Sequence, residues 1–188
     1  MSLRIIAGRL GGRRIETPEG LATRPTSERA REALFAMLEH GLPPLRGSRF
    51  LDLFAGSGAA GLEAASRGAA RVLCVDQAVA AVAAIGRNIA ALDEAEQVGV
   101  LRADACRLGP APSAFDIVFL DPPYGSGLLL PALESLAAQG WLAPGARIVA
   151  EVAARERAPL EVVEFQVEDE RAHGAARLIF LRQLPNVV

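Results

Sequence analysis

The sequence predicts an α/β protein built on a Rossmann-like, doubly wound sheet that is mostly parallel and ends in an antiparallel C-terminal hairpin. Three observations carry this prediction. From residue 50 onward strand-like and helix-like segments alternate, a glycine-rich turn follows the first strand, and no helical segment separates the last two strands. The chain has 188 residues, 51% of them hydrophobic, so it can bury one sizeable core.

The first residues predict a small β-hairpin. Residues 3–7 and 13–17 are strand-like and flank Gly11-Gly12, and a glycine pair is a strong turn signal. Further along, Pro43-Pro44 and Gly47 interrupt the chain. We therefore assign residues 1–46 to an N-terminal extension and residues 47–188 to the main domain.

A helix is expected between the hairpin and this break, with Thr26 or Ser27 as its N-terminal cap. Its apolar residues recur at spacings of three and four, at Ala30, Ala33, Leu34, Met37 and Leu38. One face of the helix should therefore pack inward, while Arg29 and Arg31 lie on another face.

The main domain is expected to alternate strands and helices, which implies a parallel sheet. Strands are expected at 50–54, 71–75, 98–101, 115–120 and 147–152, and helices at 58–67, 78–92 and 128–139. Residues 141–145 read as a turn. Segments 160–167 and 176–181, joined by a polar turn, should close the sheet edge as an antiparallel hairpin.

Charge is distributed unevenly along the chain. The net charge is −2, but residues 1–49 hold nine arginines against five glutamates, so the remainder is acidic. A basic arm on an acidic body suits an enzyme that holds a phosphate backbone at one end. A solvated charged face is the alternative explanation.

Composition also narrows the location and the chemistry. No stretch approaches the roughly 18 apolar residues of a membrane helix, and residues 1–20 carry arginines in place of a signal-peptide core. We expect a soluble, cytoplasmic protein with no membrane contact. Cys74 and Cys106 share no metal-ligand or redox spacing, so we expect no metal site and no disulfide scaffold.

The glycine-rich turn predicts an adenosine-containing cofactor. Gly56 to Gly61 fits the pattern G-x-G-x-x-G after a predicted strand, and Asp76 lies twenty positions beyond Gly56. Glycines allow the backbone to approach a ligand closely, and an acid at the end of the second strand can accept hydrogen bonds from ribose hydroxyls. The pattern alone does not distinguish a nicotinamide cofactor from other adenosine cofactors.

Asp52 favours S-adenosyl-L-methionine. It stands four residues before Gly56, where the pyrophosphate of a dinucleotide would lie, and two like charges repel in a partly dry cleft. The same carboxylate suits the cationic amino group of a methionine moiety. Asp104, just after the third strand, is the expected partner of the adenine amino group, with an ordinary surface loop as the alternative.

The D-P-P-Y segment predicts the chemistry. An apolar strand delivers Asp121, Pro122, Pro123 and Tyr124 to the ligand-binding edge of the sheet. The prolines restrict the backbone, so the Asp121 carboxylate and the Pro122 carbonyl become two fixed acceptors for one exocyclic base amine. Their hydrogen bonds would draw that nitrogen toward tetrahedral geometry, and Tyr124 would stack on the base. Methyl transfer from a sulfonium can then depend mainly on alignment, without a strong general base.

The chain resembles the RsmD-type 16S ribosomal RNA guanine-N2 methyltransferases, a class I family, nearly from end to end. The resemblance lies in R-I-I-A-G-R-L-G-G-R-R-I, T-R-P-T-S-E-R-A-R-E-A-L-F, L-D-L-F-A-G-S-G-A-A-G-L-E-A-A-S-R-G-A, V-D-Q and D-P-P-Y. The central motifs are common to class I methyltransferases, whereas the two N-terminal segments are much narrower.

The resemblance implies a bacterial enzyme that methylates N2 of the guanine at nucleotide position 966 of 16S RNA, in an assembled or nearly assembled small subunit. The cofactor-binding residues that it implies are Asp52, Phe54, Gly56, Gly58, Asp76, Asp104 and Ala105. The residues that it places around the guanine are Asp121, Pro122, Pro123 and Tyr124. It makes Arg9, Arg13, Arg14 and Arg24 contacts to RNA phosphates.

Other functions remain open from the sequence. D-P-P-Y is also similar to motifs of adenine-N6 methyltransferases acting on DNA or RNA, and the N-terminal segments argue against that reading. Guanine presents N1–H and N2–H donors that suit a carboxylate, which is a weak argument for guanine. A nicotinamide oxidoreductase and a non-catalytic RNA-binding module are further alternatives, the first opposed by Asp52.

Overall fold

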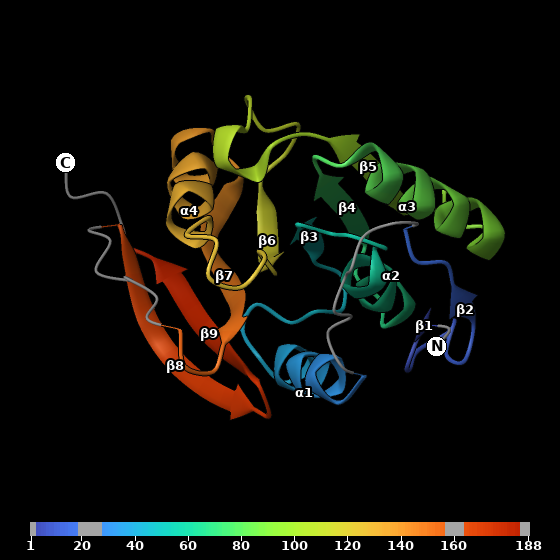
Figure 1. Ribbon diagram of the computed structural model, residues 1–188, viewed down its shortest axis with the longest axis horizontal. Coiled ribbons are helices and arrows are strands. Elements are labelled where there is room, and N and C mark those ends of the chain that lie inside the picture. Colours follow the sequence, from blue (N-terminus) through green and yellow to red (C-terminus); the bar gives the residue numbers. More distant parts are fainter. Residues whose placement is uncertain (1–2, 19–27, 157–163, 185–188) are drawn as a thin grey trace.

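A computed structural model describes residues 3–18, 28–156 and 164–184, and its centre is a seven-stranded sheet in the order β5-β4-β3-β6-β7-β9-β8 (Figure 1). The strands are β3 (Arg49–Leu53), β4 (Arg71–Asp76), β5 (Val98–Arg102), β6 (Phe115–Leu120), β7 (Leu142–Ala153), β8 (Phe165–His173) and β9 (Ala176–Gln183). The first five are parallel, and β9 runs antiparallel to both β7 and β8. The predicted sheet with an antiparallel C-terminal hairpin is confirmed.

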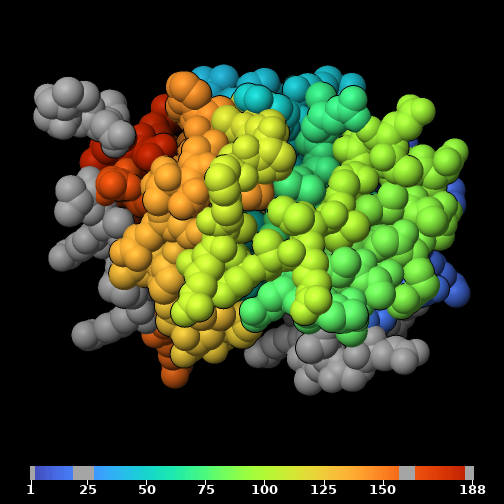
Figure 2. Space-filling view, turned by 90° about the horizontal axis from the view of Figure 1, so that it is seen from above, coloured from blue at the N-terminus to red at the C-terminus, as the bar shows by residue number. Residues whose placement is uncertain are grey.

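Helices cover both faces of the sheet. They are α1 (Glu28–Glu39), α2 (Ala59–Ser66), α3 (Val79–Leu92) and α4 (Leu129–Ala138), with a short 3-10 helix, η1 (Ala105–Arg107). The core cluster on one face includes side chains of α1, α2 and α3, and the cluster on the other face includes α4 and η1. In Figure 2 the yellow-green segment that contains η1 lies between α3 in green and α4 in gold.

The sheet supplies both clusters because side chains alternate along its strands. In β3, Phe50 packs with α1 and α2, whereas Leu51 and Leu53 belong to the cluster on the α4 side. Ile117 and Val118 of β6 divide in the same way. Central parallel strands are buried on both faces, which explains the nearly continuous apolar runs in their sequences.

Two segments expected as turns are strands. β7 begins at Leu142, which pairs with Phe115, and the register shifts before Ile117 pairs with Arg147. Gly145, at a φ of 74°, allows this irregularity within the strand. The polar residues 168–173 belong to β8, because an edge strand can leave one face in water and still pair with β9. Residues 160–163 of the expected strand lie outside the described residues.

The N-terminal hairpin forms as expected, although its strands β1 (Leu3–Arg4) and β2 (Arg14–Ile15) are short. It is fastened to α2. The buried carboxylate of Glu63 accepts from the backbone N–H groups of Ile6 at 2.7 Å and Ala7 at 3.0 Å. The Ser66 hydroxyl accepts from the N–H of Leu10 at 2.9 Å. The hairpin therefore packs on the same helix that follows the glycine-rich turn.

The orientation of α1 corrects one expectation. Arg29 is exposed, but Arg31 is only 1% exposed and lies on the inward face with Leu34, Phe35 and Leu38. Its Nη2 donates to the carbonyl of Arg4 at 2.6 Å, so the side chain joins α1 to β1. Burial lowers the pKa of Arg31 from its ordinary value. These four buried residues have the spacing i, i+3, i+4, i+7. The buried face of α1 therefore turns toward Arg31 and Phe35, and the expected inward residues Ala33 and Met37 are only half-buried.

The helix cap expected at Thr26 or Ser27 lies outside the described residues. Among the residues that the structure describes, no helix combines the length and the apolar character needed to cross a membrane.

Candidate functional site

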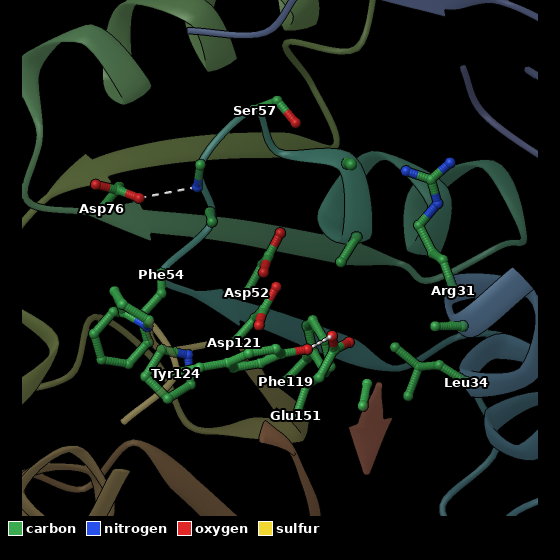
Figure 3. A pocket seen from close by; sticks show the side chains of 18 of the residues that line it. Arg31, Leu34, Asp52, Phe54, Ser57, Asp76, Phe119, Asp121, Tyr124 and Glu151 are labelled. Carbon is green, nitrogen blue, oxygen red and sulfur yellow. Dashed lines mark hydrogen bonds between the residues drawn. The ribbon is translucent and has the colours of Figure 1, made fainter. Parts of the chain in front are cut away.

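A cavity of about 680 Å³ opens at the carboxyl ends of the parallel strands. Its walls come from the turns after β3, β4 and β6, from the end of β7, from α1, and from the turn between β8 and β9. Figure 3 shows side chains from these separate elements directed toward one space. Ligands bind at this edge in open α/β sheets. The topology therefore brings together segments that are more than 100 residues apart.

The glycine-rich turn is held by the two aspartates predicted beside it. The backbone N–H of Gly61 donates to Oδ2 of Asp52 at 2.8 Å. Asp76 accepts from the N–H of Gly56 at 2.9 Å and from that of Ala78 at 2.9 Å. Both carboxylates line the cavity and also fix the turns that form its wall.

Close packing explains the glycines of this turn. A Cβ on Gly61 would stand 2.4 Å from the Sγ of Cys74, so a larger residue does not fit against β4. Gly56 has a φ of 57°, and Gly58, the residue before α2, has a φ of 77°. Phe54 also has a positive φ, at 60°, which is uncommon for an aromatic residue. Phe54 and Gly56 line the cavity, whereas Gly58 is not among its lining residues.

Asp52 has an unusual electrostatic environment. It is 2% exposed, and burial raises its pKa to about 7, aided by the charge of Asp76 and opposed by the hydrogen bond from Gly61. A buried carboxylate normally needs a cation or several hydrogen-bond donors to stay ionised. Asp52 therefore fits a cationic ligand group, such as the amino group of a methionine moiety.

The D-P-P-Y segment reaches the same cavity. Asp121, Pro122, Pro123 and Tyr124 all line it. The N–H of Asp121 donates to the carbonyl of Leu53 at 3.4 Å, which holds the start of the segment against β3. The Tyr124 ring extends beneath Asp121 in Figure 3, and its hydroxyl donates to Oε1 of Glu151 at 2.8 Å.

The two residues predicted to contact the adenine, Asp104 and Ala105, lie at the start of η1. Oδ1 of Asp104 accepts from the N–H of Cys106 at 2.9 Å and caps η1, and Ala105 is buried in the core cluster on the α4 side. Neither residue lines the cavity. Gln77 and Ala78, which follow β4, are lining residues that the sequence reading did not select.

The four predicted phosphate contacts differ in their surroundings. Both terminal nitrogens of Arg9 donate to the carboxylate of Glu94, whose side chain is 2% exposed, so Arg9 already neutralises a buried charge. Arg13 is exposed and donates to the carbonyl of Ala91 at 3.0 Å, and Arg14 is also exposed. Arg24 lies outside the described residues.

Sequence reasoning missed several residues of the cavity. Glu151 lies near the carboxyl end of the last parallel strand, and its position after an apolar run was a usable signal because Asp52, Asp76 and Asp121 also come after apolar residues near the carboxyl ends of their strands. Arg31 and the turn at His173 to Ala176 had no such signal. Within the part of the chain that the structure describes, no three His, Cys, Asp or Glu side chains gather as a metal ion would require.

Sequence comparison identifies similar proteins over most of the chain. A family model with the description "Conserved hypothetical protein 95" matches residues 3–182. Ribosomal RNA small subunit methyltransferase D of Escherichia coli (strain K12) is 35% identical over 173 residues, which cover 92% of this chain and 85% of that protein. The protein of the same name from Haemophilus influenzae is 35% identical over 153 residues, covering 79% and 78%.

Solved structures are similar as well. The Escherichia coli protein yhhF, provisionally named a methyltransferase, superposes with a TM-score of 0.80 at 33% identity and covers 97% of this chain and 98% of its own. A ribosomal protein L11 methylase from Lactobacillus delbrueckii subsp. bulgaricus has a TM-score of 0.70 at 18% identity, covers 90% and 84%, and shares the fold alone. The sheet is therefore that of the class I methyltransferases, as the sequence predicted.

Proposed function

Since this chain belongs to the RsmD family, whose model carries the description "Conserved hypothetical protein 95", we propose that it methylates ribosomal RNA of the small subunit. The donor in this proposal is S-adenosyl-L-methionine, and the acceptor is the exocyclic N2 of the guanine at nucleotide position 966 of 16S RNA. The relatives named as ribosomal RNA small subunit methyltransferase D support the RNA substrate.

One observation carries the proposal: the glycine-rich turn and the D-P-P-Y segment line a single cavity. β3 contributes Asp52, the turn contributes Gly56, and β4 contributes Asp76, while the D-P-P-Y segment after β6 brings the two proposed amine acceptors. In this proposal the adenosine cofactor and the base amine therefore bind next to each other. Methyl transfer needs this proximity, because alignment of the reacting atoms supplies much of the rate.

Three parts of the cofactor are each bound by different residues of this chain in this proposal. Asp52 binds the amino group of the methionine moiety, Asp76 the ribose hydroxyls, and Asp104 with Ala105 the adenine. Because Asp104 and Ala105 do not line the cavity, the adenine assignment has the least support of the three. When bound, the cofactor supplies a methyl group on a cationic sulfonium, which a nitrogen lone pair can accept.

The D-P-P-Y segment orients the acceptor. The Asp121 carboxylate and the Pro122 carbonyl accept hydrogen bonds from the two protons of the amine, which directs the nitrogen lone pair toward the methyl group. Tyr124 is 37% exposed, so its ring can stack on the base. Asp121 or solvent then accepts the released proton.

The N-terminal extension holds the RNA in this proposal. Arg13 and Arg14 are exposed on the hairpin that packs against α2, and their charges suit backbone phosphates. Arg24 has the same assignment from the sequence. Arg9 contributes less, because its guanidinium is already paired with Glu94. The substrate is an assembled or nearly assembled small subunit, in which the target base is extruded into the cavity.

Methyl transfer from labelled donor to three substrates tests the proposal. Undermethylated small subunits, naked 16S RNA and duplex DNA are compared, and the modified nucleosides are identified. We expect N2-methylguanosine from RNA, with assembled subunits as the best substrate. N6-methyladenosine would replace the guanine assignment with the adenine alternative. Absence of transfer to any of the three, with donor binding intact, would refute the proposal.

A further inference from the structure

A buried glutamate near the carboxyl end of β7 lies beside the D-P-P-Y segment. Leu120, the last residue of β6, pairs with Ala150 of β7, so Asp121 and Glu151 are the next residues along two neighbouring parallel strands. Glu151 lines the cavity and is 3% exposed. The Tyr124 hydroxyl donates to its Oε1 at 2.8 Å (Figure 3). The aromatic ring is thus attached to a different strand from the one that carries it.

A second carboxylate from the same region holds the peptide after Tyr124. Oε2 of Glu156 accepts from the N–H of Gly125 at 3.1 Å and from the N–H of Ala153 at 3.2 Å. The segment that follows β6 is therefore hydrogen-bonded to residues 151–156 through both a side chain and the backbone. Tyr124 is thus tethered to residues 151–156 at its hydroxyl and at the peptide that follows it, while part of the ring stays accessible.

We propose that Glu151 is a positioning residue that holds the Tyr124 ring in the plane on which the target base stacks. The identity of that base as guanine rests on the proposed function. Stacking requires the two planes to be parallel, and a ring that is already fixed loses less rotamer freedom when the base enters. The hydrogen bond from the Tyr124 hydroxyl to Oε1 of Glu151 provides this restraint before the base enters. Glu151 thereby acts on the part of the cavity that receives the target base, and not on the part that receives the cofactor.

A double-mutant cycle measures this role. Tyr124→Phe keeps the ring and Glu151→Ala removes the acceptor, so each should lower kcat/KM for RNA on the order of 10-fold to 100-fold. The double variant should be no worse than the poorer single variant, because both changes remove the same hydrogen bond. Glu151→Gln keeps an acceptor oxygen and should retain most of the activity. Affinity for the methyl donor should be unchanged in all four variants.

A matched control removes a carboxylate that does not line the cavity. Glu134 is exposed on α4, so Glu134→Ala should leave kcat, KM and donor affinity unchanged. Thermal unfolding of every variant separates loss of folding from loss of positioning. If Glu151→Ala unfolds, Tyr124→Phe and Glu151→Gln still test the hydrogen bond on a folded protein.

A spectroscopic readout independent of turnover is available because Tyr124 is the one tyrosine in the sequence. Protein labelled at its tyrosine ring carbons therefore gives a single set of ring resonances in NMR spectra. Glu151→Ala should shift the resonance of the ring carbon that bears the hydroxyl. A short guanine-containing RNA should move the ring protons upfield in the wild type, and less in Glu151→Ala.

Several results would overturn the positioning role. These are losses that multiply in the double variant, tyrosine resonances insensitive to Glu151→Ala, or a fall in donor affinity in that variant. Failure of the proposed function is recognised separately, from the wild-type enzyme. If the wild type methylates another base, the cycle and the spectra are run with that base. If it methylates guanine and Tyr124→Phe is fully active, the positioning role alone is wrong.

Discussion

Asp52 is expected to couple binding of the methyl donor to release of a proton. Burial raises the pKa of this carboxyl to about 7, whereas an ion pair with the donor's amino group requires the carboxylate form. In the free protein that form makes up about a tenth of the molecules at pH 6, half at pH 7 and nine tenths at pH 8. The apparent affinity scales with the competent fraction. The contribution of Asp52 to donor affinity should therefore rise roughly tenfold from pH 6 to pH 8.

Titration calorimetry measures this coupling directly. Donor binding is followed at pH 6, 7 and 8 in buffers of different ionisation enthalpy, which gives the number of protons released. Asp52→Asn is the matched control, because its amide oxygen can still accept from the N–H of Gly61. The variant also reports the titration of the donor's own amino group, whose usual pKa is about 8. The ratio of wild-type to variant affinity isolates the carboxyl group.

The same pKa shift sets the sign of a stability change without donor. The folded state holds the proton up to about pH 7, whereas the unfolded chain releases it near 3.8. The folded protein thus binds more protons between these values, and its free energy of unfolding should fall as pH rises through this window, by roughly 4 kcal/mol at most. Asp52→Asn should lack this component. Identical pH profiles of donor affinity and proton release in the wild type and the variant would refute the reasoning.

Three further predictions concern separate parts of the molecule. Asp121→Ala should abolish methyl transfer but leave donor affinity largely unchanged in calorimetry, and a loss of donor affinity would mean that its role is misassigned. The double variant Arg13→Ala with Arg14→Ala should bind RNA more weakly, with a shallower dependence on salt in filter-binding titrations, whereas an unchanged salt slope would exclude phosphate contacts. Glu63→Ala leaves two hairpin N–H groups without their acceptor and leaves Arg67 with Glu39 as its remaining carboxylate partner, so it should lower the free energy of denaturant unfolding by about 3 to 5 kcal/mol, and a change below about 1 kcal/mol would contradict this role.

The elements of the main domain could be predicted to within one or two residues where the pattern is local. Alternating apolar segments placed β3 to β6 and α2 to α4 close to their observed bounds. The beginning of β7 and the polar half of β8 could not be placed in this way. Both depend on a partner strand, Phe115 for Leu142 in one case and β9 in the other, and local propensity does not register such pairing.

The candidate site also contains some residues that the sequence could predict and others that only the folded structure reveals. Asp52, Asp76 and Asp121 could be predicted to converge because each lies near or just after the carboxyl end of a strand of one parallel sheet, and such strands end at a common edge. Glu151 obeys the same rule, so the sequence contained its signal. Arg9 could not be distinguished from Arg13, because only the docking of the hairpin places Arg9 against Glu94, 85 residues further along.

The amino-acid sequence by itself determined the class of fold, the order of the main elements, and the cofactor and amine motifs at the ends of their strands. These depend on the periodicity of apolar residues and on short motifs, which are local properties. The tertiary structure alone decided that Glu63 fastens the hairpin to α2, that Arg31 is buried, and that Glu151 holds the Tyr124 hydroxyl. Each of these contacts joins elements far apart in the chain, and a side chain's partner is defined only when the elements have packed.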